Sequence, residues 1–194
     1  MTQNKRVIAV TGHIGSGKST VCKTLGQYGT VLSCDRINAE MLQDERYLAK
    51  LQDAFPFAFE EGKFNKQKFS HAVFSDENVR KKLNELAHPE ILKRIFEKIN
   101  ESADELIFVE VPLLSGTPFE SFFSEVVVVT APWETRKKRV MARDSVTEAE
   151  AERKLLTQTA PLVFPQAKTY VIENVDLEKT QKDCAQLIEK LVEK

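Results

Sequence analysis

The chain has 194 residues, of which 42% are hydrophobic and 29% charged, and its formal net charge is −1. A chain of this length can bury the core of one globular domain, and its near-neutral charge argues against nucleic acid as the main partner. It has three cysteines, and we find neither a signal peptide nor an apolar run of about 18 residues, so we expect a cytoplasmic protein without disulfides, zinc or a membrane span.

Five short β-rich runs alternate with helical patterns along the chain. Most of them are continuously apolar, which is typical of parallel strands covered on both faces. The runs are 7–10, 30–33, 106–111, 126–130 and 170–172. Helical patterns occupy 19–28, 79–99 and a C-terminal segment with Cys184, Leu187, Ile188, Leu191 and Val192 on its apolar face. We therefore expect an α/β fold, a five-stranded parallel sheet with helices on both faces.

The region from about residue 42 to residue 100 is long for a single crossover between strands. It predicts a helical insertion within one domain that spans residues 1–194. Pro89 is expected to break the helical pattern of this region or to start a second helix there.

A basic helical segment that ends at Arg143 is followed by a predicted break at residues 144–146. Thr147 is expected to cap the next helix, because acidic residues fill the turn that follows it. On this basic segment, Arg136 and Lys137 are interpreted as part of a solvated helix face.

Residues 12–19 match the phosphate-loop motif G-x-x-x-x-G-K-[ST] in full. They closely follow the first β-rich run and precede a helical pattern, which is the context that the motif requires. Its glycines let backbone N–H groups surround a phosphate, and the helix N-terminus adds partial positive charge. Lys18 is expected to reach the β- and γ-phosphates of a nucleotide, and Ser19 to ligate Mg²⁺. The loop comprises Gly12, His13, Ile14, Gly15, Ser16, Gly17, Lys18 and Ser19, with His13 as a spacer.

The rest of the sequence favours a small-molecule kinase over a GTPase. The string nearest to a guanine-reading Asn-Lys-x-Asp is 65–68, which lacks the aspartate. In small kinases, positioning and charge neutralisation supply most of the catalysis. The second strand is interpreted as ending in Asp35, which would face the phosphate loop, because ligands bind beyond the carboxyl ends of parallel strands. Asp35 would then accept a hydroxyl proton, or it would simply cap the next helix.

An ordered set of motifs resembles the dephospho-coenzyme A kinase family over nearly the whole chain. The motifs that follow the phosphate loop and Asp35 are Glu61-Gly62-Lys63-Phe64-Asn65-Lys66, Val73-Phe74, Leu83-Asn84 with His88-Pro89, Val111-Pro112-Leu113-Leu114, Arg139-Val140-Met141-Ala142-Arg143 and Val171-Ile172-Glu173-Asn174. Each of these later motifs is weak alone, but their common order along the chain is specific.

The resemblance implies an enzyme that transfers a phosphoryl group from ATP to the ribose 3′-hydroxyl of dephospho-coenzyme A, with Mg²⁺ as cofactor. Asp35 would be the base and Lys18 would hold the transferring phosphoryl group. Arg143, with Arg139, would close over the ATP phosphates from a lid at about residues 134–168, because guanidinium donors match phosphate oxygens.

The same resemblance implies which residues bind the phosphoryl donor and which bind the acceptor. ATP would contact the phosphate loop together with Thr20, Arg139, Arg143 and Asn174. Dephospho-coenzyme A would contact Asp35, His88, Pro112 and Leu113, partly from the helical insertion. For His88, capping a helix that begins at Pro89 is an equally good interpretation.

Three departures from the family pattern concern the lid and the acceptor contacts more than the core chemistry. Ser33 stands where a first carboxylate is frequent, Ser115-Gly116 follows the Pro-Leu-Leu motif, and the stretch 160–165 is apolar where basic residues are usual.

Two other functions therefore stay open. One is a kinase for a nucleoside, nucleotide or shikimate-like acceptor, and the other is a nucleotide- or coenzyme A-binding protein with little turnover.

Overall fold

The computed structural model describes residues 5–193 and divides the chain into two compact units. The first, here called the sheet unit, runs up to Ser33 and resumes at Glu101. The second, here called the helical unit, is Cys34–Asn100. Within residues 5–193, no helix combines the length and the apolar composition needed to cross a bilayer.

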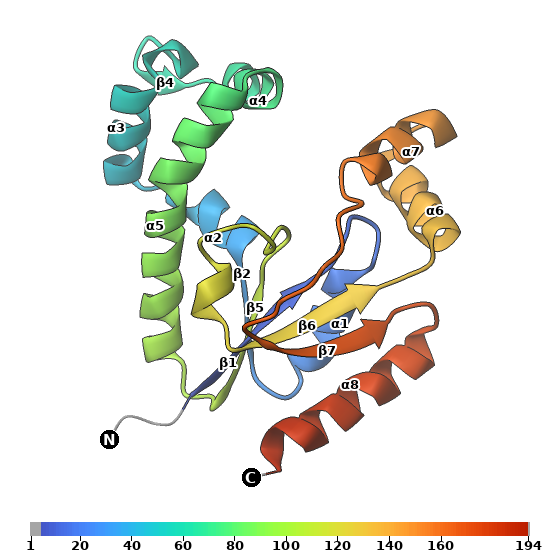
Figure 1. The fold of residues 1–194 in the computed structure, drawn as a ribbon. Helices are drawn as coiled ribbons and strands as arrows, with labels where there is room; N and C mark the ends of the chain where they lie inside the picture. The colour runs from blue at the N-terminus through green and yellow to red at the C-terminus, as the bar shows by residue number, and fades with distance from the viewer. Residues whose placement is uncertain (1–4, 194) are drawn as a thin grey trace. The chain divides into compact units, whose positions relative to one another are not determined.

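The sheet unit is built on a parallel sheet of five strands in the order β2-β5-β1-β6-β7 (Figure 1). The strands are β1 (Arg6–Thr11), β2 (Thr30–Ser33), β5 (Leu106–Glu110), β6 (Glu125–Thr130) and β7 (Lys168–Glu173). All five predicted strands are confirmed, and a short 3₁₀ turn, η2 (Glu120–Phe122), precedes β6. The prediction that the second strand runs to Asp35 is wrong, because β2 ends at Ser33 and a helix begins at Cys34.

Two helices, α1 (Lys18–Leu25) and α8 (Leu177–Val192), share one hydrophobic core with the sheet. Val21 and Leu25 of α1 and Leu187 of α8 belong to this core. The predicted apolar face of α8 is correct except for Val192, whose side chain is exposed in the last turn. The expected helix at 19–28 ends at Leu25, since Gly26 follows and favours termination.

Two of the cysteines, Cys22 and Cys184, are buried in this core. Burial raises the pKa of the Cys22 thiol to about 12 and that of Cys184 to about 11. Both side chains are therefore packing groups rather than nucleophiles at neutral pH.

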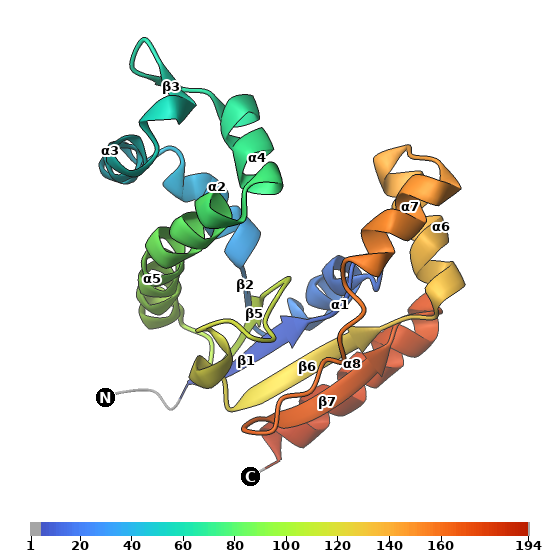
Figure 2. The same ribbon diagram turned by 45° about the horizontal axis from the view of Figure 1, so that its top comes forward.

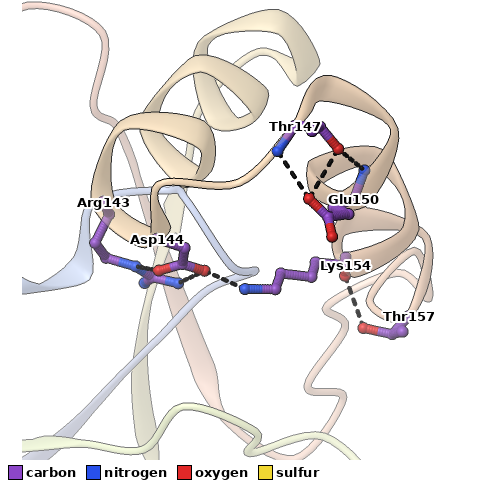
Figure 3. Close-up of polar contacts among 6 residues, drawn as sticks. All are labelled: Arg143, Asp144, Thr147, Glu150, Lys154 and Thr157. Atoms are coloured by element: carbon purple, nitrogen blue, oxygen red, sulfur yellow. Dashed lines mark hydrogen bonds and ion pairs between the residues drawn. The ribbon is translucent and has the colours of Figure 1, made fainter.

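Two helices that follow β6, α6 (Trp133–Asp144) and α7 (Glu148–Leu156), lie side by side in both views (Figures 1 and 2). The predicted break between them is confirmed, with Ser145 in the left-handed region at φ 52°. Thr147 caps α7 as predicted, and Glu150 completes a capping box (Figure 3).

The interpretation of Arg136 and Lys137 as a solvated face is wrong, because both side chains are buried. Lys137 forms ion pairs with three carboxylates, those of Glu134, Glu148 and Glu152. These hydrogen bonds raise the pKa of Lys137, with the bond to Glu148 as the largest cause. A cation whose partners come from both helices therefore ties α6 to α7.

The helical unit contains four α-helices, a 3₁₀ turn and a small hairpin. Its elements are α2 (Cys34–Met41), α3 (Glu45–Ala54), η1 (Pro56–Ala58), β3 (Phe59–Glu60), β4 (Lys63–Phe64), α4 (Lys66–Ser75) and α5 (Glu77–Glu101), whose last residue lies in the sheet unit. The long helix α5 is linked to α2 through the ion pair Lys98–Glu40 and to the start of α3 through Arg94–Asp44.

Pro89 neither ends nor starts a helix, contrary to both expectations, because α5 is continuous through it. A proline inside a helix costs about 3 kcal/mol. In α5 the buried side chains Ala87, Ile91 and Ile95 continue the packed face on both sides of the proline, and this burial offsets the lost backbone hydrogen bond.

Candidate nucleotide-binding site

The phosphate loop connects β1 to α1 at the carboxyl edge of the sheet. Gly15 and Gly17 have φ values of 78° and 86°, which favour glycine. A Cβ on Gly15 would lie 2.7 Å from the carbonyl oxygen of Arg136, and one on Gly17 would overlap Nδ2 of Asn174. Both glycines are thus required by backbone conformation and by close neighbours.

Lys18 folds back over the loop that precedes it. Its Nζ donates to the carbonyl oxygens of Gly12 at 2.7 Å and His13 at 3.4 Å. These bonds hold the ammonium group on the loop, beside the N-terminus of α1. Since a helix N-terminus also favours anions, the loop combines two features that bind phosphate.

Asn174, immediately after β7, is almost fully buried behind the loop. Its Nδ2 donates to the carbonyl oxygens of Ser16 at 3.0 Å and Gly17 at 3.1 Å, and its Oδ1 accepts from Thr180 at 3.1 Å. Asn174 therefore supports the loop from behind, in addition to any contact with a ligand.

A surface pocket of about 580 Å³ lies beside the phosphate loop. Pockets for small ligands commonly have volumes of about 300–1,000 Å³. Arg139 borders the pocket, and its Nη1 donates to the carbonyl oxygen of Ser16 at 3.2 Å. The pocket is lined by Ser19, Thr20, Lys23, Arg139, Asn174, Val175 and Leu177. A predicted set of nucleotide-binding residues, Ser19, Thr20, Arg139 and Asn174, thus shares one pocket.

Arg143 is on the last turn of α6, where its side chain is exposed and paired with Asp144 (Figure 3). Nε donates to Oδ1 of Asp144 at 2.7 Å and Nη2 donates to Oδ2 at 3.2 Å. Lys154 of α7 donates to the same carboxylate at 2.5 Å. The hydrogen bond from Arg143, followed by that from Lys154, holds the pKa of Asp144 well below its usual range.

The predicted acceptor residues are distributed over both units. Asp35 is exposed in the first turn of α2, and His88 is half-buried in α5, where burial lowers the pKa of its imidazole. Pro112 and Leu113 follow β5 in the sheet unit, and Leu113 is 60% exposed. The roles of these four residues in acceptor binding stay predictions.

Glu110 is a candidate functional residue that the sequence interpretation missed. It is the last residue of β5 and pairs in register with Val10 of β1 and Ser33 of β2. Its carboxylate is therefore on the strand next to the one that leads into the phosphate loop. An apolar run that ends in an acidic residue, Leu-Ile-Phe-Val-Glu, was the available signal, because P-loop proteins place a metal-associated carboxylate at such a strand end.

The sheet order, the complete phosphate loop and the adjoining pocket define a P-loop kinase fold. A shikimate kinase from Bacteroides thetaiotaomicron has this fold, with a TM-score of 0.56 at 15% identity over 96% of this chain and 98% of its own. A family model described as dephospho-CoA kinase matches residues 6–178. The chain therefore belongs to the dephospho-CoA kinase family.

Individual relatives agree with this assignment. A dephospho-CoA kinase of Listeria monocytogenes is 33% identical over 96% of this chain and 98% of its own length. One from Thermus thermophilus is 33% identical over 91% and 88%. A crystal structure of a Thermus thermophilus protein has a TM-score of 0.83 at 28% identity, covering 98% of this chain and 100% of that one. The dephospho-CoA kinase from Campylobacter jejuni has a TM-score of 0.58 at 25% identity over 96% and 97%.

Proposed function

We propose that this protein transfers the γ-phosphoryl group of ATP to the ribose 3′-hydroxyl of dephospho-CoA, which gives CoA and ADP in the last step of CoA biosynthesis. The observation that carries the proposal is the family match over residues 6–178, which includes the complete phosphate loop. The 15% identity to a shikimate kinase concerns the fold alone and does not favour a shikimate-like acceptor.

On the donor side, the ATP phosphates would lie on the phosphate loop, where Lys18 neutralises charge on the transferring group. The nucleoside would extend into the pocket beside the loop. The apolar side chains of Val175 and Leu177 and the guanidinium plane of Arg139 are suitable surfaces for a purine base.

The oxygen donors at the site fit Mg²⁺, which prefers oxygen ligands and usually keeps several waters beside substrate phosphates. Ser19 offers an exposed hydroxyl at the start of α1, and Glu110 offers a carboxylate on the neighbouring strand. No cluster of three or more His, Cys, Asp or Glu in the described part of the chain forms a metal cage of its own. When bound, Mg²⁺ would neutralise charge on the β- and γ-phosphates.

On the acceptor side, Asp35 would take the proton of the 3′-hydroxyl as the phosphoryl group arrives. The helical unit would bind the remainder of dephospho-CoA, with His88 in α5 as one contact. Pro112 and Leu113 would contribute from the loop after β5. The support for these roles is the match of each residue to a motif that resembles the family.

The proposed reaction is tested by coupling ADP release to an optical signal with several acceptors. We expect ATP turnover with dephospho-CoA, and much slower turnover with adenosine, AMP or shikimate. Faster turnover with one of those acceptors would identify a different small-molecule kinase. Tight binding of dephospho-CoA without turnover would instead support a binding protein.

Arg143→Ala is expected to lower kcat by at least ~10-fold, a cautious floor for the loss of one contact that stabilises charge in the transition state. The pairing with Asp144 uses Nε and Nη2, so the guanidinium can meet a phosphate with Nη1 while it stays anchored. Steady-state kinetics with saturating dephospho-CoA measure the effect. Lys138→Ala, an exposed cation on the same helix, is the matched control. Equal losses in the two variants would mean that α6 contributes only a diffuse positive field.

A further inference from the structure

One residue of the phosphate loop, Ile14, is held through its backbone by α6 and the segment after α7, and through its side chain by α6 and α7. Its N–H donates to Oε1 of Gln158 at 2.7 Å. Its carbonyl oxygen accepts from Nε of Arg136 at 2.9 Å. Its side chain packs against the small hydrophobic core that includes Val140 of α6 and Leu155 of α7. The motif leaves the residue type at this position open, and here an isoleucine packs against side chains of α6 and α7.

Arg136 is arranged to support this contact rather than to meet solvent. Its side chain is buried, and its guanidinium lies 5.7 Å from the centre of the Trp133 ring. Burial lowers the pKa of this guanidinium, and Nη2 has no hydrogen-bond partner among residues 5–193. Nε, which donates to the Ile14 carbonyl oxygen, is the atom through which Arg136 contacts the loop.

A second contact connects the same part of the loop to the segment after α7. A ring nitrogen of His13, Nε2, lies 3.0 Å from the carbonyl oxygen of Ala160, and it must be the donor because a carbonyl only accepts. On the other side of Ile14, Gly15 leaves no space for a Cβ beside the backbone of Arg136. The loop is therefore bound to α6 on one side and to residues 158–160 on the other.

We propose that Arg136 and Gln158 are positioning residues that hold the backbone of Ile14 between them, so that the lid fixes the conformation in which the phosphate loop binds ATP. This inference rests on the proposed kinase function. Neither side chain needs to touch a substrate. Displacing a phosphate site by a fraction of an ångström misaligns the transferring group, and a misplacement of about 1 Å can lower a rate by ~10²-fold.

Side-chain isosteres separate the hydrogen bond of Arg136 from its charge. In glutamine the amide nitrogen is the same number of bonds from Cα as Nε is in arginine, so Arg136→Gln keeps the donor and loses the charge. Arg136→Met matches the arginine side chain as far as the position of Nε and loses both the donor and the charge. Gln158→Met removes the acceptor for the Ile14 N–H, and Lys138→Met controls for the loss of a long side chain from the exposed face of α6.

The measurements are kcat and KM for ATP, the affinity for MgATP by calorimetry without acceptor, and a melting curve. We expect Arg136→Met and Gln158→Met each to lower kcat by ~10–10²-fold, with a smaller rise in KM. Arg136→Gln should retain at least about half of the wild-type kcat, because its amide replaces Nε as the donor. The double variant should lose less than the product of the single losses, since both side chains hold the backbone of the same residue, Ile14.

Four results would overturn the proposal. The first is a normal kcat in both Arg136→Met and Gln158→Met, and the second is a loss of kcat in Arg136→Gln as large as that in Arg136→Met. The third is a double variant whose loss of kcat equals the product of the single losses. The fourth is a loss of kcat that disappears when the assay is run well below each variant's melting temperature. Should the wild-type protein fail to phosphorylate dephospho-CoA, the proposed function would fail. The calorimetric affinities for MgATP would still test the positioning of the loop.

Discussion

Replacing Lys18 by alanine is expected to lower kcat by at least ~10²–10³-fold, the range measured when one pre-positioned donor to a developing charge is removed. Nζ of Lys18 is held on the loop by the carbonyl oxygens of Gly12 and His13, so it requires little rearrangement to meet the phosphates. Arg139 does not take the same place, because it lies at the adjoining pocket and donates to the carbonyl of Ser16.

The fold should survive this substitution, because the side chain of Lys18 is partly exposed and does not belong to the hydrophobic core. A melting curve that changes little beside a nearly complete loss of ADP release would therefore agree with the assignment. Lys18→Arg tests geometry, since a guanidinium keeps the charge but differs in shape and in its donor directions. Near-normal kcat in Lys18→Ala would contradict the role of the loop.

The strands and the phosphate loop could be predicted because their signals are local. Continuous apolar runs mark the strands, and residues 12–19 match a motif in which each glycine lies where a Cβ would come too close to a neighbouring atom. The predicted break at Pro89 is wrong, because proline disfavours a helix locally but the buried side chains of Ala87 and Ile91 continue the packed face of α5 across it.

Helices α6 and α7 show why charge alone is a poor guide to exposure. Lys137 is buried because carboxylates from two helices converge on it. A tertiary arrangement of that kind cannot be predicted from the sequence of one segment. A signal was nevertheless present, since Trp133, Arg136, Lys137 and Val140 have the i, i+3, i+4, i+7 spacing of one helix face. With an apolar residue at each end, that face was a candidate for burial.

Asp35→Asn is expected to lower kcat by ~10²–10⁴-fold while ATP still binds, because a general base typically accelerates a reaction by a factor in that range. The ribose 3′-hydroxyl is a poor nucleophile while it keeps its proton, and an amide accepts that proton far less readily than a carboxylate. Neither neighbour replaces the carboxylate, since Ser33 and Cys34 are not ordinarily anions at neutral pH. Asp35 stands in the first turn of α2, two residues beyond the end of β2, with its side chain exposed.

The alternative role for Asp35 is purely structural, since an acidic residue in the first turn stabilises a helix by only ~0.3–1 kcal/mol. Glu45 is the matched control, as an exposed carboxylate in the first turn of α3 in the same unit. If Asp35 is the base, Asp35→Asn and Glu45→Gln should lower the melting temperature by similar small amounts, and turnover should fall in Asp35→Asn while Glu45→Gln stays active. Calorimetry with MgATP would report unchanged affinity in both, because the phosphate loop is untouched. Full activity in Asp35→Asn would leave it as a helix-stabilising residue, and the base would then have to be sought among other carboxylates, with Glu110 tested first.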